Sequence, residues 1–229
     1  MPGPSAGEHS VMVWDDTDTD YWLAKEGEVA KELVDLSGCG VVIGSRCYDK
    51  GWTDDPRIFA RKGAAEALVT AKNNLPSGLN IKVFDGWRPW KYQERIAAAA
   101  YRKIRSYHPD WTDDDVRAYQ WKMAPPARIV PRFASHRYGG AFDVTLVDEN
   151  GDECDMGVPV GYNGGPETQL LWYHLLTNPD AKARAIKSNR SVLITAMSTA
   201  GFQPYLEEFW HWNYLRDVEA ASRETTGNV

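Results

Sequence analysis

The sequence predicts an α+β fold in which helices pack against an antiparallel sheet, and that sheet carries a metal site. Helical and strand-like segments follow one another without the regular alternation of strand and helix that builds a parallel sheet. A chain of 229 residues suits one large domain or two small ones. We expect a single domain over residues 1–229, with its folded core at about 41–214 and flexible ends at 1–10 and 222–229.

The N-terminal half predicts four elements from its periodicity and its stop signals. Asp55 and Pro56 are a capping acid and a proline of the first helical turn. Leu79, Ile81 and Val83 alternate with polar residues, as in a strand with one buried face. The expected elements are a helix over 20–34, a strand over 41–43, a helix from 55 to about 74 and a strand over 79–84.

The C-terminal half predicts the remaining elements in the same way. Thr112 with Asp115 three residues later resembles a capping box, so we expect a helix to begin there. Asn150-Gly151 favours a tight hairpin turn, and Gly201 stands where a helix should stop. The expected elements are helices over 90–107, 170–176 and 181–200, the helix that Thr112 opens, and strands over 141–147, 153–156 and 205–214.

Composition and charge argue against several classes of partner. The net charge is −6 and basic residues form no stripe, which argues against a nucleic-acid partner. No apolar run is long enough to cross a membrane, and the sequence shows no secretory signal. We therefore expect a cytoplasmic protein without a membrane partner. The three cysteines, Cys39, Cys47 and Cys154, lack CxxC spacing and are interpreted as free thiols. The oligomeric state does not follow from the sequence.

Residues 135–143, Ser-His-Arg-Tyr-Gly-Gly-Ala-Phe-Asp, offer an imidazole and a carboxylate seven residues apart. Gly139 and Gly140 allow a sharp bend between His136 and the strand that carries Asp143. Asp143 stands within an apolar strand, where a carboxylate is costly unless a cation or several donors meet it. A buried aspartate that caps a turn is the alternative interpretation. Because His136 is close by in the sequence, we predict that Asp143 binds a metal.

A second segment, Glu207-Glu208-Phe209-Trp210-His211, offers a carboxylate three residues before another imidazole. Two neutral imidazoles and one carboxylate suit a tetrahedral zinc ion that keeps its fourth position for water. The remaining carboxylate can then accept a proton from that water. Glu208 and His211 would point to opposite faces of a regular strand, so we predict a bulge or tight bend there. Glu207 competes with Glu208 for the role of base.

The segment Asp85-Gly86-Trp87-Arg88-Pro89 directly follows the strand predicted over 79–84. A guanidinium at the end of a strand presents a fork of fixed charge to an oxyanion. In a metal hydrolase it would help to stabilise the tetrahedral intermediate. A simple salt bridge between Arg88 and Asp85 is the alternative.

Together the three segments resemble the D-alanyl-D-alanine dipeptidase family, the VanX-like zinc peptidases. That family has an Asp-Gly-Tyr-Arg-Pro segment, a segment with serine and histidine that ends in Gly-x-Ala-x-Asp, and a Glu-x-Trp-His segment, in this order. Here they are Asp85 to Pro89, Ser135 to Asp143, and Glu208 to His211. Weaker similarity extends the resemblance over about 41–214. The fold it implies is a small α+β domain whose antiparallel sheet bears the metal.

The resemblance also implies a role for each matching residue. The ligands of the single zinc ion (Zn2+) would be His136, Asp143 and His211. Glu208 would be the general base and would later protonate the leaving amine. Arg88 would polarise the scissile carbonyl and hold the oxyanion, and Ser135 would bind the substrate carboxylate. The implied activity is cleavage of a dipeptide such as D-Ala-D-Ala, or of a related small amide.

The chain departs from the family where the substrate's ammonium group binds. The family has an acid shortly after a Met-Gly pair, and the matching position here is Gly161. A buried ammonium without a carboxylate binds poorly, which argues against free D-Ala-D-Ala as the substrate. Tyr48 and Glu167 are our candidates for the substrate pocket, and Glu167 can substitute for the missing acid because it follows the glycine-rich loop.

Two other hypotheses stay open on the sequence alone. Two imidazoles and one carboxylate also suit ferrous iron (Fe2+) with open positions. The same scaffold would then act on a specialised metabolite, by hydrolysis or oxidation. A binding module without catalysis predicts the loss of a ligand or of the base, and all of these residues are present.

Overall fold

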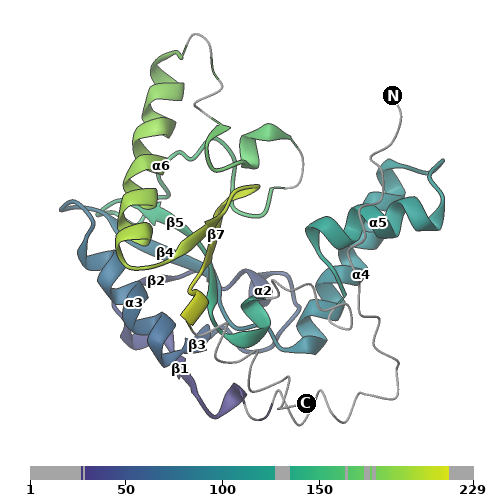
Figure 1. Ribbon diagram of the computed structural model, residues 1–229, viewed down its shortest axis with the longest axis horizontal. Coiled ribbons are helices and arrows are strands. Elements are labelled where there is room, and N and C mark those ends of the chain that lie inside the picture. Colours follow the sequence, from purple (N-terminus) through teal and green to yellow (C-terminus); the bar gives the residue numbers. More distant parts are fainter. Residues whose placement is uncertain are drawn as a thin grey trace. The chain divides into compact units, whose positions relative to one another are not determined.

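The computed structural model describes residues 27, 29–126, 135–162, 165–172, 176 and 179–216 (Figure 1). The chain forms two compact units, one of residues 1–26 and 89–134 and the other of residues 27–88 and 135–229. The mixture of helices and largely antiparallel strands confirms the α+β class. The single domain expected from the sequence stays a prediction, and the ends expected to be flexible lie outside the described residues. No helix among the described residues is long and apolar enough to span a bilayer.

The described part of the smaller unit contains a pair of helices, α4 (Trp90–Tyr107) and α5 (Asp113–Met123). The bounds of α4 are those that the sequence predicts. Thr112 and Asp115 form the predicted capping box, because each side chain accepts a hydrogen bond from the backbone N–H of the other residue. Gln120 of α5 donates from Nε2 to the carbonyl of Ala97 at 2.9 Å and so links the two helices.

The larger unit is built on a five-stranded sheet in the order β2-β4-β5-β7-β6. Its strands are β2 (Val42–Ile43), β4 (Asn80–Asp85), β5 (Ala141–Val147), β6 (Gln203–Tyr205) and β7 (Glu208–Asn213). The β2–β4 pair is parallel, and the other three pairs are antiparallel. A separate antiparallel pair joins β1 (Leu33–Asp35) to β3 (Phe59–Arg61). The predicted antiparallel sheet is thus confirmed, apart from its parallel edge at β2.

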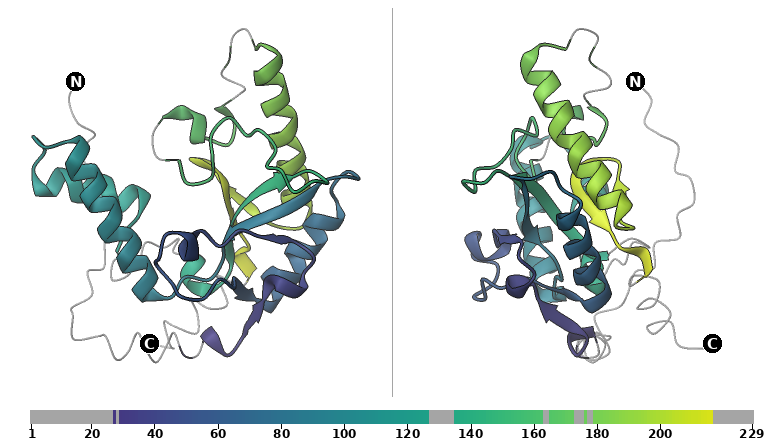
Figure 2. Two further views of the ribbon diagram at one scale, coloured as in Figure 1. Left: turned by 180° about the vertical axis from the view of Figure 1, so that it is seen from behind. Right: turned by 90° about the vertical axis from the view of Figure 1, so that its left-hand side faces the viewer.

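The helices of the larger unit are α2 (Arg46–Asp49), α3 (Lys62–Asn73) and α6 (Ala181–Thr199), with short 3-10 turns η2 (Leu36–Gly38), η3 (Ser135–Tyr138) and η4 (Pro166–Thr168). Helices α3 and α6 lie side by side along the sheet (Figures 1 and 2). Asp180 begins α6 by accepting the backbone N–H of Ala183 at 2.7 Å. The helix predicted over 181–200 is therefore confirmed to within one residue.

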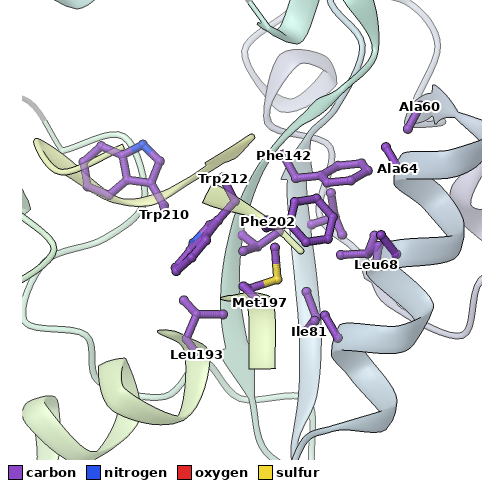
Figure 3. Packing of buried hydrophobic residues seen from close by; sticks show 14 of the residues in the cluster. Ala60, Ala64, Leu68, Ile81, Phe142, Leu193, Met197, Phe202, Trp210 and Trp212 are labelled. Carbon is purple, nitrogen blue, oxygen red and sulfur yellow. The ribbon is translucent and has the colours of Figure 1, made fainter. Parts of the chain in front are cut away.

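The main hydrophobic core lies between these two helices and one face of the sheet (Figure 3). Leu68 of α3, Met197 of α6, and the cross-strand partners Phe142 and Trp212 are all 0% exposed. Burying one such side chain contributes about 1.5–3 kcal/mol. Because side chains alternate along a strand, the residues next to Phe142 and Trp212 point to the opposite face. The core therefore anchors one face of β5 and β7 and leaves the other for chemistry.

The prediction of a helix from Asp55 is wrong at its start. Residues Phe59–Arg61 form β3, which pairs with Leu33–Asp35, and the helix begins only at Lys62. The same pairing makes the end of the helix expected over 20–34 a strand. Gly27, Val29 and Ala30 are helical, and residues 20–26 lie outside the described part of the chain.

Three predictions in the C-terminal half also need correction. The strand expected over 205–214 is a hairpin of β6 and β7, with a turn at Leu206 and Glu207. In the strand expected over 153–156, Glu153 alone pairs among the described residues, opposite Val147. Leu170 and Leu171, where the helix over 170–176 was expected to begin, form a turn; Trp172 is in a 3-10 helix, and 173–175 lie outside the described residues.

Candidate metal centre and active site

Three neighbouring strands bring Asp85, Asp143 and His211 together. Asp143 of β5 is the cross-strand partner of Asp85 of β4 on one side and of His211 of β7 on the other. The register of β4 shifts between Val83 and Asp85, and this irregularity sets Asp85 rather than Phe84 opposite Asp143. Directly opposed side chains share a face of the sheet. These three residues therefore lie on the face opposite the core.

His136 reaches the same place from η3, just before β5. Its Nδ1 lies 2.7 Å from the carbonyl oxygen of Gly86, and its own carbonyl accepts the backbone N–H of Arg88 at 3.0 Å. A Cβ at Gly86 would stand 2.6 Å from the carbonyl oxygen of Phe59, so only glycine fits there. Gly139 has φ +72° and makes the predicted bend between His136 and β5.

The three sequence-predicted ligands offer atoms that form a nearly equilateral triangle. His136 Nε2 lies 3.3 Å from Asp143 Oδ1 and 3.1 Å from His211 Nδ1, and His211 Nδ1 lies 3.1 Å from Asp143 Oδ1. Ligands bonded to a tetrahedral zinc at about 2.0–2.1 Å stand about 3.3 Å from one another. The size of the triangle therefore fits a small divalent cation.

Each imidazole has a hydrogen-bond acceptor beside its outer nitrogen, on the side away from this triangle. His136 Nδ1–H donates to the carbonyl of Gly86, and His211 Nε2–H donates to Asn213 Oδ1 at 3.1 Å. In neutral imidazoles this leaves His136 Nε2 and His211 Nδ1 as lone pairs, facing a carboxylate oxygen. Three acceptors without a proton between them repel one another, and a cation removes that repulsion. Such partners for the outer nitrogen are usual for metal-binding histidines.

Asp143 divides its two oxygens between the triangle and Arg88. Arg88 Nη2 donates to Asp143 Oδ2 at 3.0 Å, and Arg88 Nε donates to Asp85 Oδ2 at 2.6 Å. Burial opposes ionisation of Asp143. When the imidazoles are protonated and no cation is bound, the charge of His136, hydrogen bonds from His136 and His211, and the charge of Arg88 outweigh burial and hold the pKa of this carboxyl well below its usual range. The salt bridge of Arg88 to Asp85 that the sequence left open is thus present.

Glu208 begins β7 and faces the same group. Tyr205 of β6 pairs with Glu208, whereas the preceding Pro204 pairs with Trp212. Residues 209–211 of β7 therefore have no partner in β6 and form a bulge. This confirms the predicted irregularity. Burial, with the negative charge of Asp143, raises the pKa of Glu208 above 4.5 despite the nearby His211. Glu207 differs, because its carboxylate is exposed and accepts from Gln169 Nε2 at 3.2 Å.

The sequence of this chain matches the family model of the D-ala-D-ala dipeptidases over residues 49–223, which is most of its length. The chain belongs to that family. It is 26% identical over 193 residues to the D-alanyl-D-alanine dipeptidase of Escherichia coli, covering 79% of this chain and 83% of that protein. It is 25% identical over 170 residues to the D-alanyl-D-alanine dipeptidase of Synechocystis sp., covering 69% and 68%. The resemblance predicted from three motifs is confirmed, and this family member is a metallopeptidase-type enzyme.

The substrate-binding residues predicted for this dipeptidase-family chain are less closely tied to the triangle. Tyr48 lies on α2 and is largely exposed, and Glu167 lies in η4. Within the described residues, no hydrogen bond joins either side chain to His136, Asp143 or His211. Ser135 is the first residue of η3, immediately before His136.

Two residues that support the site in this dipeptidase-family chain escaped the sequence analysis. Asn213 follows His211 by two positions in β7, so the alternation of a strand would have placed it beside that histidine. Cys47 of α2 donates from Sγ to Asp85 Oδ2 at 3.4 Å, across 38 residues of sequence. Burial and the charge of Asp85 raise the pKa of the Cys47 thiol, so it stays protonated. No local signal indicates that contact.

Proposed function

We propose that this chain is a zinc-dependent hydrolase that cleaves a dipeptide such as D-Ala-D-Ala, or a related small amide. The observation that carries the proposal is the convergence of three ligand atoms, His136 Nε2, Asp143 Oδ1 and His211 Nδ1, beside a half-buried Glu208. Two imidazoles and one carboxylate form a common ligand set of catalytic zinc sites, which keep one position open. Membership of the D-ala-D-ala dipeptidase family supports the same reaction.

The residues around the triangle suit amide hydrolysis. When bound, a zinc ion supplies Lewis acidity, which lowers the pKa of water and polarises a carbonyl oxygen. Glu208 accepts a proton from the attacking water and returns it to the leaving amine. A carboxyl whose pKa is raised by burial is a better match to both transfers at neutral pH than an exposed one. Arg88 places fixed positive charge beside Asp143 and contributes to holding the developing oxyanion.

The surroundings of Gly161 support an N-blocked substrate rather than a free dipeptide. Arg46 Nη2 donates to the carbonyl of Gly161 at 3.3 Å. A Cβ at position 161 would lie 1.7 Å from Arg46 Nη1, so the guanidinium occupies the space that a side chain would need. Gly161 stands where the family has an acid for the substrate's ammonium group, and a cation there repels an ammonium. We therefore propose that the amine of the substrate is acylated or otherwise neutral.

The test is a turnover screen with zinc-loaded protein. The substrates are free and N-acetylated dipeptides of L,L, D,D and mixed configuration, with release of the C-terminal amino acid as the readout. We expect hydrolysis of D,D substrates, with the N-acetylated form preferred. Glu208→Gln should keep one zinc per chain and lose turnover, whereas Glu207→Gln, at an exposed carboxylate, should keep both. Near-normal turnover by Glu208→Gln would show the assigned base to be wrong.

The same preparation identifies the metal. Elemental analysis of protein purified without added metal is expected to give one zinc per chain. Stoichiometric iron, with no peptidase activity after zinc loading, would instead favour the second hypothesis, in which a ferrous enzyme of this fold acts on a specialised metabolite. A cytoplasmic role in the turnover of D-amino-acid dipeptides or in peptidoglycan recycling fits the proposed reaction.

A further inference from the structure

Tyr205 stands directly beside the two residues that define the reactive side of the metal centre. It is the cross-strand partner of Glu208, and its ring meets the ring of His211 edge-on, with centroids 5.8 Å apart and planes at 77°. Without the register shift, Tyr205 would have paired with His211, and Glu208 would not have been its cross-strand partner. The bulge in β7 instead brings base, ligand and tyrosine into one group.

The ring of Tyr205 is packed on one side and open on the other. Its strand, β6, is at the edge of the five-stranded sheet, and no further strand among the described residues covers it there. The residue keeps 42% of its surface exposed although it contacts His211. A tyrosine that only supports a metal ligand would be expected to be buried around its whole ring. Part of Tyr205 is therefore accessible beside the candidate metal centre.

The hydroxyl of Tyr205 is an uncommitted hydrogen-bond donor. Among the residues that the structure describes, it makes no hydrogen bond. Burial, with the charges of Glu208 and Glu207, raises the pKa of the phenol, so the hydroxyl keeps its proton. Arg88, by contrast, has Nε and Nη2 engaged with Asp85 and Asp143. A free donor beside an open metal position is what a polar substrate atom requires.

We propose that Tyr205 is a substrate-contacting catalytic residue, whose hydroxyl donates a hydrogen bond to the carbonyl oxygen of the scissile amide. As water adds to the carbonyl carbon, the C=O π electrons move onto that oxygen, and the hydrogen bond strengthens with the growing charge. The proton stays on Tyr205, since Glu208 carries the transferred proton. The exposed ring face forms an apolar wall beside the substrate side chain. This inference rests on the proposed hydrolysis and adds a donor to it.

The experiment compares zinc-loaded wild type, Tyr205→Phe and Tyr107→Phe. The Phe variant keeps the ring against His211 and removes only the hydroxyl. Tyr107, an exposed tyrosine at the end of α4, provides the matched control. The readouts are kcat and KM for N-acetyl-D-Ala-D-Ala and D-Ala-D-Ala, zinc stoichiometry, and calorimetric binding of a phosphinate isostere of D-Ala-D-Ala, which carries negative oxygens in a tetrahedral arrangement.

For Tyr205→Phe we expect kcat to fall about 100-fold with KM unchanged, which is the usual effect of removing one donor to an oxyanion. The phosphinate should lose affinity by a similar factor, zinc should remain at one per chain, and Tyr107→Phe should match wild type. If wild type is active and Tyr205→Phe has the same kcat, the role of Tyr205 is overturned, while the proposed function stands. Loss of zinc from Tyr205→Phe overturns it too, because the residue would then only support His211. A wild type that neither cleaves the dipeptides nor binds the phosphinate overturns the proposed function, and the Tyr205 assignment with it.

Discussion

Arg88 Nη2 donates to Asp143 Oδ2 at 3.0 Å, while the other oxygen of the same carboxylate faces His136 and His211 of the candidate metal centre. The guanidinium is fixed in turn by Asp85, which also accepts from Cys47 Sγ. A continuous series of hydrogen bonds thus runs from a thiol on α2 to the proposed metal ligand on β5. The orientation of Asp143 depends on Arg88 because the carboxylate can rotate once this partner is lost.

This relationship predicts different effects for two substitutions of Arg88. Arg88→Ala leaves the buried carboxylates Asp85 and Asp143 facing each other without a cation, which should lower the free energy of unfolding by about 3–5 kcal/mol. Arg88→Lys keeps the charge but cannot bridge both carboxylates with a planar fork. We expect Arg88→Lys to lower the free energy of unfolding by less than Arg88→Ala does. Its kcat should still fall about 10- to 100-fold, because the oxyanion loses an oriented donor.

Urea unfolding of the metal-free proteins and steady-state kinetics of the zinc-loaded ones measure the two effects separately. Arg57→Lys is the control, since Arg57 pairs with Asp55 at the surface and should change neither quantity. Wild-type kcat in Arg88→Lys would mean that the guanidinium acts only as a charge, and its assignment to the oxyanion would have to be withdrawn.

The raised pKa of Glu208 predicts that this residue destabilises the metal-free protein at neutral pH. Burial, followed by the charge of Asp143, makes its carboxylate costly. A carboxyl with a raised folded-state pKa contributes stability below its unfolded pKa, and that contribution is lost as pH rises through the folded pKa. In the presence of a chelator, Glu208→Gln should therefore be more stable than wild type at pH 7. The difference should shrink as pH falls towards 4.5 and below.

Urea unfolding between pH 4 and pH 8 tests this pH dependence, with Glu207→Gln as the exposed control. That control should follow wild type across the whole range, because its carboxylate is solvated. A Glu208→Gln protein that is less stable than wild type at pH 7 without metal would contradict the placement of Glu208 against Asp143.

Elements with local signals were predicted well from the sequence. The capping box of Thr112 and Asp115 is satisfied by atoms three residues apart, and β5 is buried on both faces because the core covers one face and the site the other. The convergence of His136, Asp143 and His211 was also predictable, since these residues stand within short motifs. A motif indicates the chemical role of its residues more strongly than helix or strand preference indicates secondary structure.

Elements that depend on distant partners were not predictable in the same way. Asp55 was interpreted as a helix cap, but its carboxylate accepts the backbone N–H of Arg57 two residues later and pairs with that side chain. This is a turn rather than a helix start. The chain then extends because Leu33–Asp35 offers a strand to pair with, and nothing near Asp55 encodes that partner. Cys47 joined the site through such a long-range contact too.

Zinc binding should stabilise the native protein, because the three converging lone pairs exist together only in the folded state. At a free zinc concentration about 1,000 times the Kd, the free energy of unfolding should rise by about 4 kcal/mol. His211→Ala removes one corner of the triangle and should abolish this gain. Asn213→Ala leaves all three ligands but removes the acceptor that holds His211 Nε2–H. It should keep one zinc per chain and bind it about 10- to 100-fold more weakly.

Thermal unfolding with and without zinc, together with competition against a chelator of known affinity, separates these variants. His108→Ala is the control, because His108 stacks on Trp111 in the smaller unit and the zinc-dependent rise in Tm should survive its loss. If Asn213→Ala binds zinc as tightly as wild type, the outer hydrogen bond does not orient His211. If His211→Ala keeps the full rise in Tm, the ion sits elsewhere, and the argument from the triangle fails with it.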